Sequence, residues 1–437
     1  MGQGKRSGGR GMESFGAVLR HLRQAQGLTQ ADVAGRHLTR AHISAVERGA
    51  SRLSIDGLKY LIATLHQPDV LVQAYCTAYP PEPSWIELVR FLVLRGHRDL
   101  AESVVRIAQG TLRSRPGSAV ESLRLAFDGW SLKLRDRAAA AALHLSRAAG
   151  VALRARRWYE GAVSLWHSGE ALVETGQFVR AISHFRRARV LLGSRQSRRA
   201  LTMLGHLWRS EGAVFQRLGL HGRSRACLLQ ARQMYGEAGH SVEEGHALIE
   251  LSLALLGEGK PAEAKAVLCE AGSILHRAGH QTCWPILTLN LGIALAEMGH
   301  HRESLPLLTE ARSVPELKTA AYAALELARL HACQGQPDQA REALQDAVGT
   351  CDTVEQARRL ALQGALGTRP RAEAHMKILA LAQTTYHPLE EATLLFEAAR
   401  YANAGGAPGW SLELSLRAYS CLKAAWPSNW PNNQDSR

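Results

Sequence analysis

Apolar residues recur at three- and four-residue spacing along nearly the whole chain, and Ala, Leu, Arg, Glu and Gln dominate the positions between them. This period places the apolar side chains on one face of each segment, which is typical of amphipathic helices that share a core. Alternating segments rich in β-branched residues, which would indicate strands, are nearly absent. The pattern therefore predicts an all-α fold.

The N-terminal region, residues 13–67, holds four short predicted helices. Phe15, Leu19 and Leu22 share one face of the first helix, which we expect to end at Gly27. Because these helices are short and each has an apolar face, they must pack on one another to bury it. The segment is therefore predicted to form a compact helical bundle.

Each later helix of this bundle begins with a capping signal. The stretch Thr29-Gln-Ala-Asp32 has the spacing of a capping box, which starts the second helix. Thr39 is the expected N-cap of a third helix, in which Ile43 and Val46 point inward. Ser54 is the expected N-cap of a fourth helix with a closing stripe of leucines.

From Leu19 to Leu65 the chain resembles the Cro/XRE-type helix-turn-helix of phage repressors and many bacterial regulators. The matching positions are Leu22-Arg23, Gly27 to Gln30, Val33-Ala34, Ile43-Ser44, Val46-Glu47, Gly49 and the late leucines. The turn Gly35-Arg-His-Leu38 is shorter than in the phage repressors, and Leu53 stands where proline is common. The resemblance implies that the third helix enters the major groove of double-stranded DNA.

The resemblance also assigns roles to the residues around that helix. Arg40 is the favoured guanine reader because its planar fork can bond O6 and N7 together, and Ala41 offers an apolar contact to a thymine methyl. Gln30, Arg48 and Arg52 are expected to contact phosphate. The predicted DNA-binding set is Thr29, Gln30, Thr39, Arg40, Ala41, His42, Ser44, Arg48 and Arg52. The alternative is a bundle that keeps this fold as a protein-docking module.

After this bundle the chain predicts a connecting helix and then a long helical array. The predicted divisions are a flexible basic tail (1–12), the helix-turn-helix domain (13–67), a linker helix (68–83), the array (84–427) and a frayed end (428–437). Translation that begins at Met12 would remove most of the tail, and the sequence does not distinguish the two starts.

A four-position pattern repeats through the array: a glycine, a small residue five positions later, a larger apolar residue four further on, and an alanine three after that. The clearest copy is Gly176, Ala181, Phe185 and Ala188; other copies begin at Gly96, Gly219, Gly259, Gly299 and Gly335, and weaker ones centre on Arg135/Ala140 and on Ala392, Phe396 and Ala399. Such self-similarity predicts a solenoid of helical hairpins. It resembles a tetratricopeptide array with longer repeats.

The resemblance to tetratricopeptide arrays implies a concave surface, lined by the first helix of each hairpin, that binds an extended peptide. The predicted ligand-binding positions are His167, Glu170, Glu174, Arg209, Gln216, Glu250, Asn290, Glu326 and Arg329. Asn290 is the favoured clamp because an amide side chain both donates to and accepts from a peptide backbone. Solvated contacts and contacts between repeats are the alternative for each of these residues.

The two halves together resemble the peptide-responsive quorum-sensing regulators of Gram-positive bacteria, the group of Rgg, PlcR, NprR and PrgX. That resemblance implies a homodimer that binds a short signalling peptide in the array and then changes its DNA binding. Asparagine is scarce here, whereas that group often clamps its peptide with several, so the class of ligand stays open. A scaffold that sequesters a partner protein is the alternative, and a phosphatase acting through the array is a third.

Charge and composition agree with this interpretation. Of the net charge of +14, residues 1–66 supply ten Lys/Arg against four Asp/Glu, which suits a polyanionic partner. The seven scattered cysteines form no C-x-x-C pair, as in reduced proteins of the cytoplasm. No apolar run approaches the roughly 18 residues that cross a bilayer. We therefore expect a cytoplasmic protein without a membrane partner.

Signals for metals, cofactors and catalysis are weak. The pair His276/His280 has helical spacing, but no carboxylate or thiol completes a metal site at ligand spacing. No nucleophile stands beside a base within a known motif. The sequence therefore predicts no metal, no cofactor and no enzymatic activity.

Overall fold

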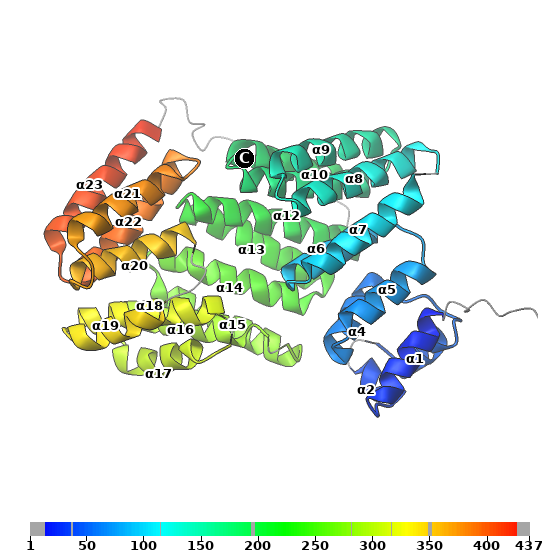
Figure 1. Ribbon diagram of the computed structural model, residues 1–437, viewed down its shortest axis with the longest axis horizontal. Coiled ribbons are helices and arrows are strands. Elements are labelled where there is room, and N and C mark those ends of the chain that lie inside the picture. The colour runs from blue at the N-terminus through cyan, green and yellow to red at the C-terminus, as the bar shows by residue number, and fades with distance from the viewer. Residues whose placement is uncertain are drawn as a thin grey trace, which may run out of the picture. The chain divides into compact units, whose positions relative to one another are not determined.

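A computed structural model describes residues 14–35, 38–113, 115–193, 197–280, 282–315, 317–347 and 352–425. Every regular element in these ranges is a helix, which confirms the all-α prediction (Figure 1). The predicted tail (1–12) and frayed end (428–437) lie outside the described residues. Within the described part of the chain, no helix is both long and apolar enough to span a membrane.

The first five helices form the N-terminal bundle. They are α1 (Phe15–Ala25), α2 (Gln30–Ala34), α3 (Arg40–Glu47), α4 (Ile55–Leu65) and α5 (Pro68–Ala78). The predicted caps are confirmed: Thr29, Thr39 and Ser54 each accept a hydrogen bond from a backbone N–H in the first turn that follows. The capping box between Thr29 and Asp32 is complete in both directions. These local signals therefore begin α2, α3 and α4 where the sequence places them.

Helix α5 belongs to this bundle, which differs from the predicted linker helix at 68–83. Helix α5 packs against α1 and α4. The hydroxyl of buried Tyr75 donates to the Leu53 carbonyl oxygen at 3.0 Å, and its ring meets that of Phe15 edge to face. Because burial of these aromatic rings closes the core, the domain continues to the end of α5.

The helices after the bundle fall into two compact units, one ending at Ala171 and one beginning at Leu172, where a single array was predicted. The first unit continues through α6 (Ser84–Leu94), α7 (Arg98–Leu112), α8 (Ser118–Leu134), α9 (Ala138–Arg154) and most of α10 (Trp158–Glu174). The second unit holds α11 (Phe178–Leu192), α12 (Arg198–Arg217), α13 (His221–Ala238), α14 (Ser241–Gly257), α15 (Pro261–Arg277), α16 (Trp284–Glu297), α17 (His301–Arg312), α18 (Leu317–Cys333), α19 (Pro337–Asp346), α20 (Thr353–Ala365), α21 (Arg371–Gln383), α22 (Pro388–Ala404) and α23 (Pro408–Ala425).

Successive helices of the array pack against each other in pairs. Five glycines of the repeat lie in the turns between paired helices, Gly96, Gly219, Gly259, Gly299 and Gly335, and the sixth, Gly176, follows the end of α10. All six have a positive φ, between 68° and 81°, which a residue with a side chain adopts only at a cost. The green helices α12 to α15 of Figure 1 show two such hairpins in succession. The repeat pattern therefore marks the turn of each hairpin, as predicted.

Two weaker copies of the repeat need correction. The left-handed turn before α9 is at Asp136, with φ of 56°, and Ala141 follows five residues later in the core. The predicted pair Arg135/Ala140 is therefore displaced by one residue. The other weak copy lies on α22, the first helix of its hairpin, where Phe396 is 38% exposed and fills no groove.

Close approach inside the hairpins depends on glycines of the first helix as well as on the repeat's small residues. A Cβ on Gly292 of α16 would lie 2.8 Å from the side chain of Leu308 on α17. A Cβ on Gly212 of α12 would lie 3.1 Å from Leu228 on α13. In these two repeats the large apolar residue therefore packs directly on the backbone of the partner helix.

Candidate DNA-binding and ligand-binding sites

Helix α3 carries the surface that the sequence predicts to read DNA. Ile43 and Val46 are buried in the bundle, as predicted, so the helix has one fixed inward face. Arg40 and Ala41 are exposed at its N-terminal end, and His42 and Ser44 are half-buried. The Thr39 hydroxyl accepts from the His42 backbone N–H at 3.1 Å and thereby caps the end that presents Arg40. No acidic side chain lies in the first turn of α3.

A buried carboxylate, Glu47, ties this helix to its neighbours. Its side chain is about 1% exposed, and Arg23 of α1 donates to both of its oxygens, at 2.6 and 3.2 Å. Burial alone would raise the pKa of the Glu47 carboxyl, but hydrogen bonds from Arg23 and Gln30 hold that pKa below its ordinary value. Both Arg23 and Glu47 belong to the helix-turn-helix resemblance, although the sequence assigns them no role.

The two predicted contacts on α2 already take part in hydrogen bonds of the bundle. Gln30 Nε2 donates to Glu47 Oε2 at 2.8 Å, so that amide holds α3 in place. The Thr29 hydroxyl lies 2.6 Å from the Asp32 carboxylate within the capping box. Gln30 therefore positions the recognition helix in this structure, whatever else it contacts.

The two arginines that follow α3 differ in their surroundings. Arg48 is exposed, and its guanidinium donates to the Ser44 hydroxyl at 2.8 Å. Arg52 instead forms an ion pair with Glu82 at 3.1 Å and lies 4.7 Å from the ring centre of Tyr79. Arg52 thus has partners within its own unit, so Arg48 is the better placed of the two for phosphate.

In the first unit, the predicted ligand contact His167 lies in the core and not on the surface. Its side chain is fully buried. The centre of its imidazole ring lies 4.9 Å from that of the Trp130 ring and 4.5 Å from that of the Trp166 ring. Burial lowers the pKa of His167, against the opposing effect of Glu170, whose carboxylate lies 3.0 Å from its Nδ1. Glu170 is also within 3.8 Å of Lys133. Trp130, Trp166 and Glu170 thus surround His167 in the core of the first unit and leave its side chain no exposed surface for a ligand.

In the second unit, the polar residues predicted on α12 and α14 pair with one another. Arg209 Nε donates to Glu250 Oε1 at 2.9 Å, and both side chains are about one-third exposed. Gln216 Oε1 lies 3.5 Å from Nδ1 of His221. Glu174, at the end of α10, is exposed. The pair between Arg209 and Glu250 joins the first helices of two consecutive hairpins, which matches the predicted line of first-helix residues.

Asn290 is the predicted clamp residue, and its side-chain amide is buried. The residue lies on α16 and is only 3% exposed. Its Nδ2 is buried and has no hydrogen-bond partner in the structure. A buried donor without an acceptor costs about 1–3 kcal/mol, so few such groups occur in folded proteins. The amide is therefore a polar group for which the described residues supply no acceptor.

Asn290→Leu should raise the free energy of unfolding of the second unit by about 1 kcal/mol, because leucine has a similar volume and no N–H to satisfy. Chemical denaturation of the full-length protein, followed by circular dichroism, measures the change. Asn290→Asp is the control, since it buries a charge and should destabilise. A leucine variant less stable than the parent protein would mean that the amide stabilises the fold.

Glu326 and Arg329 lie in a set of three arginines and three glutamates on four helices, which we call the arginine–glutamate cluster: Arg329, Arg358, Arg400, Glu297, Glu326 and Glu397. Arg329 bridges Glu297 and Glu326, with both N–O distances 2.8 Å. The hydroxyl of buried Tyr401 donates to Glu326. The six charges cancel, so the cluster joins α16, α18, α20 and α22 without excess charge. The predicted ligand residues Glu326 and Arg329 are thus already paired.

Acid should weaken the second unit through Glu326. Burial raises the pKa of this carboxyl, but Arg329, Arg358 and the Tyr401 hydroxyl bring it down to about 2. A depressed pKa contributes stability above the unfolded value of about 4.3, and that stability is lost as the pH falls toward the folded value. Denaturation of Glu326→Gln between about pH 6 and pH 3 should show a shallower loss than the parent protein. Parallel curves would contradict this prediction.

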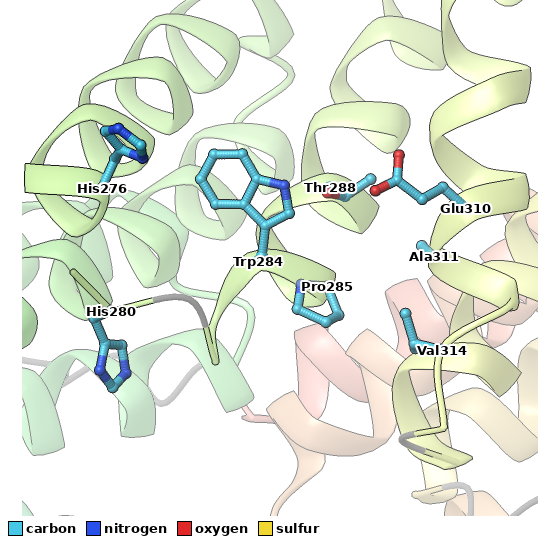
Figure 2. Close-up of a pocket in the computed structure, with 8 residues that line it drawn as sticks. All are labelled: His276, His280, Trp284, Pro285, Thr288, Glu310, Ala311 and Val314. Atoms are coloured by element: carbon cyan, nitrogen blue, oxygen red, sulfur yellow. The ribbon is translucent and has the colours of Figure 1, made fainter. Parts of the chain in front are cut away.

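A pocket that the sequence did not indicate lies between three segments: the end of α15, the start of α16 and the end of α17. Its volume is about 420 Å³, and it is lined by His276, His280, Trp284, Pro285, Thr288, Glu310, Ala311 and Val314. Figure 2 shows the two histidines on one side, Glu310, Ala311 and Val314 on the other, and Trp284 and Pro285 between them. An indole wall with one carboxylate suits an apolar or basic side chain.

The bundle matches a known family. Residues 14–74 match the family described as a helix-turn-helix domain, which covers α1 to α4 and most of α5. The inclusion of α5 agrees with its packing in the structure. Among curated proteins, no sequence matches this chain significantly. The N-terminal part of the chain is therefore a helix-turn-helix domain.

Solved structures of low sequence identity share the fold. A Rap protein complexed with Competence and Sporulation Factor has a TM-score of 0.58 and 13% identity, with 78% of this chain and 97% of that chain covered. The Rap conjugation gene regulator of plasmid pLS20, in complex with the Phr* peptide, has a TM-score of 0.52 and 14% identity, and the match covers 79% of this chain and 97% of that chain. The apo form of the quorum sensor NprR from B. thuringiensis has a TM-score of 0.52 and 10% identity, and the match covers 77% of this chain and 97% of that chain. The prediction of a tetratricopeptide-like array is confirmed.

Proposed function

We propose that this protein is a sequence-specific DNA-binding regulator whose helical array binds a signal, a short peptide before other classes, and changes the DNA binding of a dimer. The observation that carries the proposal is the presentation of α3. Its N-terminal turn is capped by Thr39 and exposes Arg40 and Ala41, while Glu47 ties its other end to α1 and α2. A recognition helix needs exposed side chains at its N-terminal end, where it contacts DNA, and a C-terminal end that is held in place by the rest of the domain.

DNA reading on this proposal follows from the side chains at that end. Arg40 bonds O6 and N7 of a guanine in the major groove, and Ala41 contacts a thymine methyl. Arg48 contacts backbone phosphate and sets the register of the domain on the duplex. Two copies of the chain, related by a twofold axis, would read half-sites about 34 Å apart on a nearly palindromic operator.

Peptide sensing rests on two features of the second unit. The buried Nδ2 of Asn290 lacks an acceptor among the described residues, and a peptide carbonyl would supply one once the side chains that cover this amide move aside. The pocket beside Trp284 offers room of about 420 Å³ for one side chain. A related fold bound to the Phr* peptide supports the same ligand class. A ligand acts on DNA binding only if it binds one state of the dimer better than another.

The alternative proposal is a scaffold that sequesters a partner protein through the array and binds no specific DNA. Its support is the extensive pairing of the polar residues predicted to face a ligand, such as Arg209 with Glu250. Paired side chains of this kind suit a rigid docking surface. The basic N-terminal region would then bind DNA only through charge.

Fluorescence anisotropy of the full-length protein on its own upstream DNA and on scrambled DNA, across a range of salt, tests the proposed function. Sequence reading should give binding to the upstream DNA that persists after the scrambled DNA has dissociated. A purely electrostatic contact weakens equally on both as salt rises, because its free energy comes from counterion release. Equal affinities at every salt concentration would reject the regulator and favour the scaffold.

A further inference from the structure

Three side chains with metal-binding atoms converge in the second unit. His246 lies on α14, His280 lies in the turn between α15 and α16, and Cys283 is the N-cap residue of α16. One potential ligand atom of each lies within 4.8 Å of the other two, and all three side chains are half-buried. His246 Nε2 is 2.8 Å from Cys283 Sγ, and the two imidazole rings are 5.8 Å apart between centres.

The sequence did not indicate this group, because helical spacing pairs His280 with His276 and not with His246. His276 has helical spacing to His280, and the structure places both in the pocket wall of Figure 2. The additional nitrogen comes instead from His246, on a helix earlier in the chain, and the thiol comes from Cys283. A thiol therefore lies beside His280, which the sequence interpretation did not take into account.

We propose that His246, His280 and Cys283 bind one Zn²⁺ ion, with its fourth position open to water or to a donor from a ligand. Imidazole nitrogen and thiolate sulfur both bind Zn²⁺, and zinc sites with three protein ligands keep a fourth position open. Bond lengths of about 2.0–2.3 Å separate the ligand atoms of a tetrahedral site by about 3.3–3.8 Å. The separation of 2.8 Å between Nε2 and Sγ must widen by less than about 1 Å, which side-chain rotation supplies. Binding replaces the thiol proton, which passes to the solvent.

The position of the site gives it a structural consequence. It joins α14 of one hairpin to the turn that leads into α16 of the next. The Thr282 hydroxyl, 2.6 Å from His280 Nε2, helps to hold that imidazole in place. His280 also lines the pocket beside Trp284, so an ion would fix one wall of the pocket. This inference is independent of DNA binding and goes beyond the proposed function.

Cobalt titration of the full-length, chelator-treated protein tests the site, since Co²⁺ occupies zinc sites and gives a thiolate-to-metal charge-transfer band when cysteine coordinates it. We expect one equivalent of Co²⁺ to produce that band and Zn²⁺ to displace it. Cys283→Ser should abolish the band. His246→Ala removes a direct ligand and should therefore weaken Co²⁺ binding by more than about 100-fold, since loss of a residue that only hydrogen-bonds to a ligand already costs about 10- to 100-fold. Cys269→Ser and His276→Ala are matched controls from α15 and should bind as the parent protein does.

Thermal melting separates loss of the site from loss of the fold. Without metal, Cys283→Ser should melt with the parent protein, and Zn²⁺ should raise the melting temperature of the parent only, since an ion that binds the folded state stabilises it. No charge-transfer band in the parent protein, a band that survives Cys283→Ser, or equal loss in His276→Ala would each overturn the proposal.

Discussion

Glu47→Ala should destabilise the helix-turn-helix bundle by about 3–5 kcal/mol, the cost of removing one partner from a buried ion pair. The variant leaves Arg23, whose side chain is 12% exposed, without its carboxylate. It also frees the amide of Gln30, so α3 loses the side-chain hydrogen bonds that join Glu47 to α1 and α2 and keeps its apolar packing through Ile43 and Val46. Hydrogen exchange of the full-length protein, read on peptides from α1 to α3, measures the local free energy of unfolding.

Arg20→Ala is the matched control for that experiment. Arg20 also approaches the Glu47 carboxylate, at 3.7 Å, but its side chain is 47% exposed. An exposed pair of this kind contributes at most about 1 kcal/mol. If amide protection in α1 to α3 falls equally in both variants, the buried ion pair does not anchor the recognition helix.

Arg40→Ala should lower affinity for the selectively bound upstream DNA by about 1–3 kcal/mol, or roughly 5- to 150-fold, and relax the preference over scrambled DNA. The loss has this size because one bidentate contact to guanine disappears while the phosphate contacts remain. The anisotropy measurement at a fixed salt concentration checks it. Arg40 is exposed and its substitution removes no core contact, so the bundle should keep its stability.

Arg48→Ala distinguishes base reading from phosphate contact. It should weaken binding to both DNAs by a similar factor and reduce the magnitude of the salt slope by about 1, since one fewer counterion is released. A loss in Arg40→Ala that is equally non-selective would mean that Arg40, too, contacts only phosphate. Base recognition would then have to lie elsewhere on α3.

The helix boundaries of the bundle were predictable because their signals are local. Thr29, Thr39 and Ser54 each cap the helix that directly follows, and Ile43 and Val46 share a face through helical periodicity alone. The turns of the array were predictable for the same reason, since a left-handed turn favours glycine at one position. Such features depend on a few neighbouring residues and need no knowledge of the tertiary fold.

Contacts between distant segments were not predictable in this way. The role of α5 depends on how Tyr75 meets Phe15, and the turn at Asp136 is hidden because no glycine marks it. His167 has the spacing of a surface residue, yet two tryptophans cover it. Periodicity indicates which side of a helix is apolar, but not which neighbours will cover a polar residue on its edge.

The candidate ligand site was predictable only in part. The spacing of first-helix residues correctly placed Asn290, Glu326 and Arg329 on equivalent helices, α16 and α18. It did not show that the Asn290 amide lacks an acceptor among the described residues, nor that Glu326 accepts from Tyr401, because Tyr401 comes from α22, two hairpins later. The approach of His246 to His280 and Cys283 was not predictable either, because His246 comes from a helix about 34 residues earlier in the chain.

The charge balance of the arginine–glutamate cluster also constrains how this chain can change over generations. Loss of Glu326 or Arg329, whose side chains are 6% and 12% exposed, unbalances a buried group of charges, so we expect single substitutions at either position to be rare. Exchange of both members for apolar residues of similar volume avoids that penalty. Related chains should therefore carry either both charges or neither, and this covariation would identify the array of this protein even where other sequence similarity has been lost.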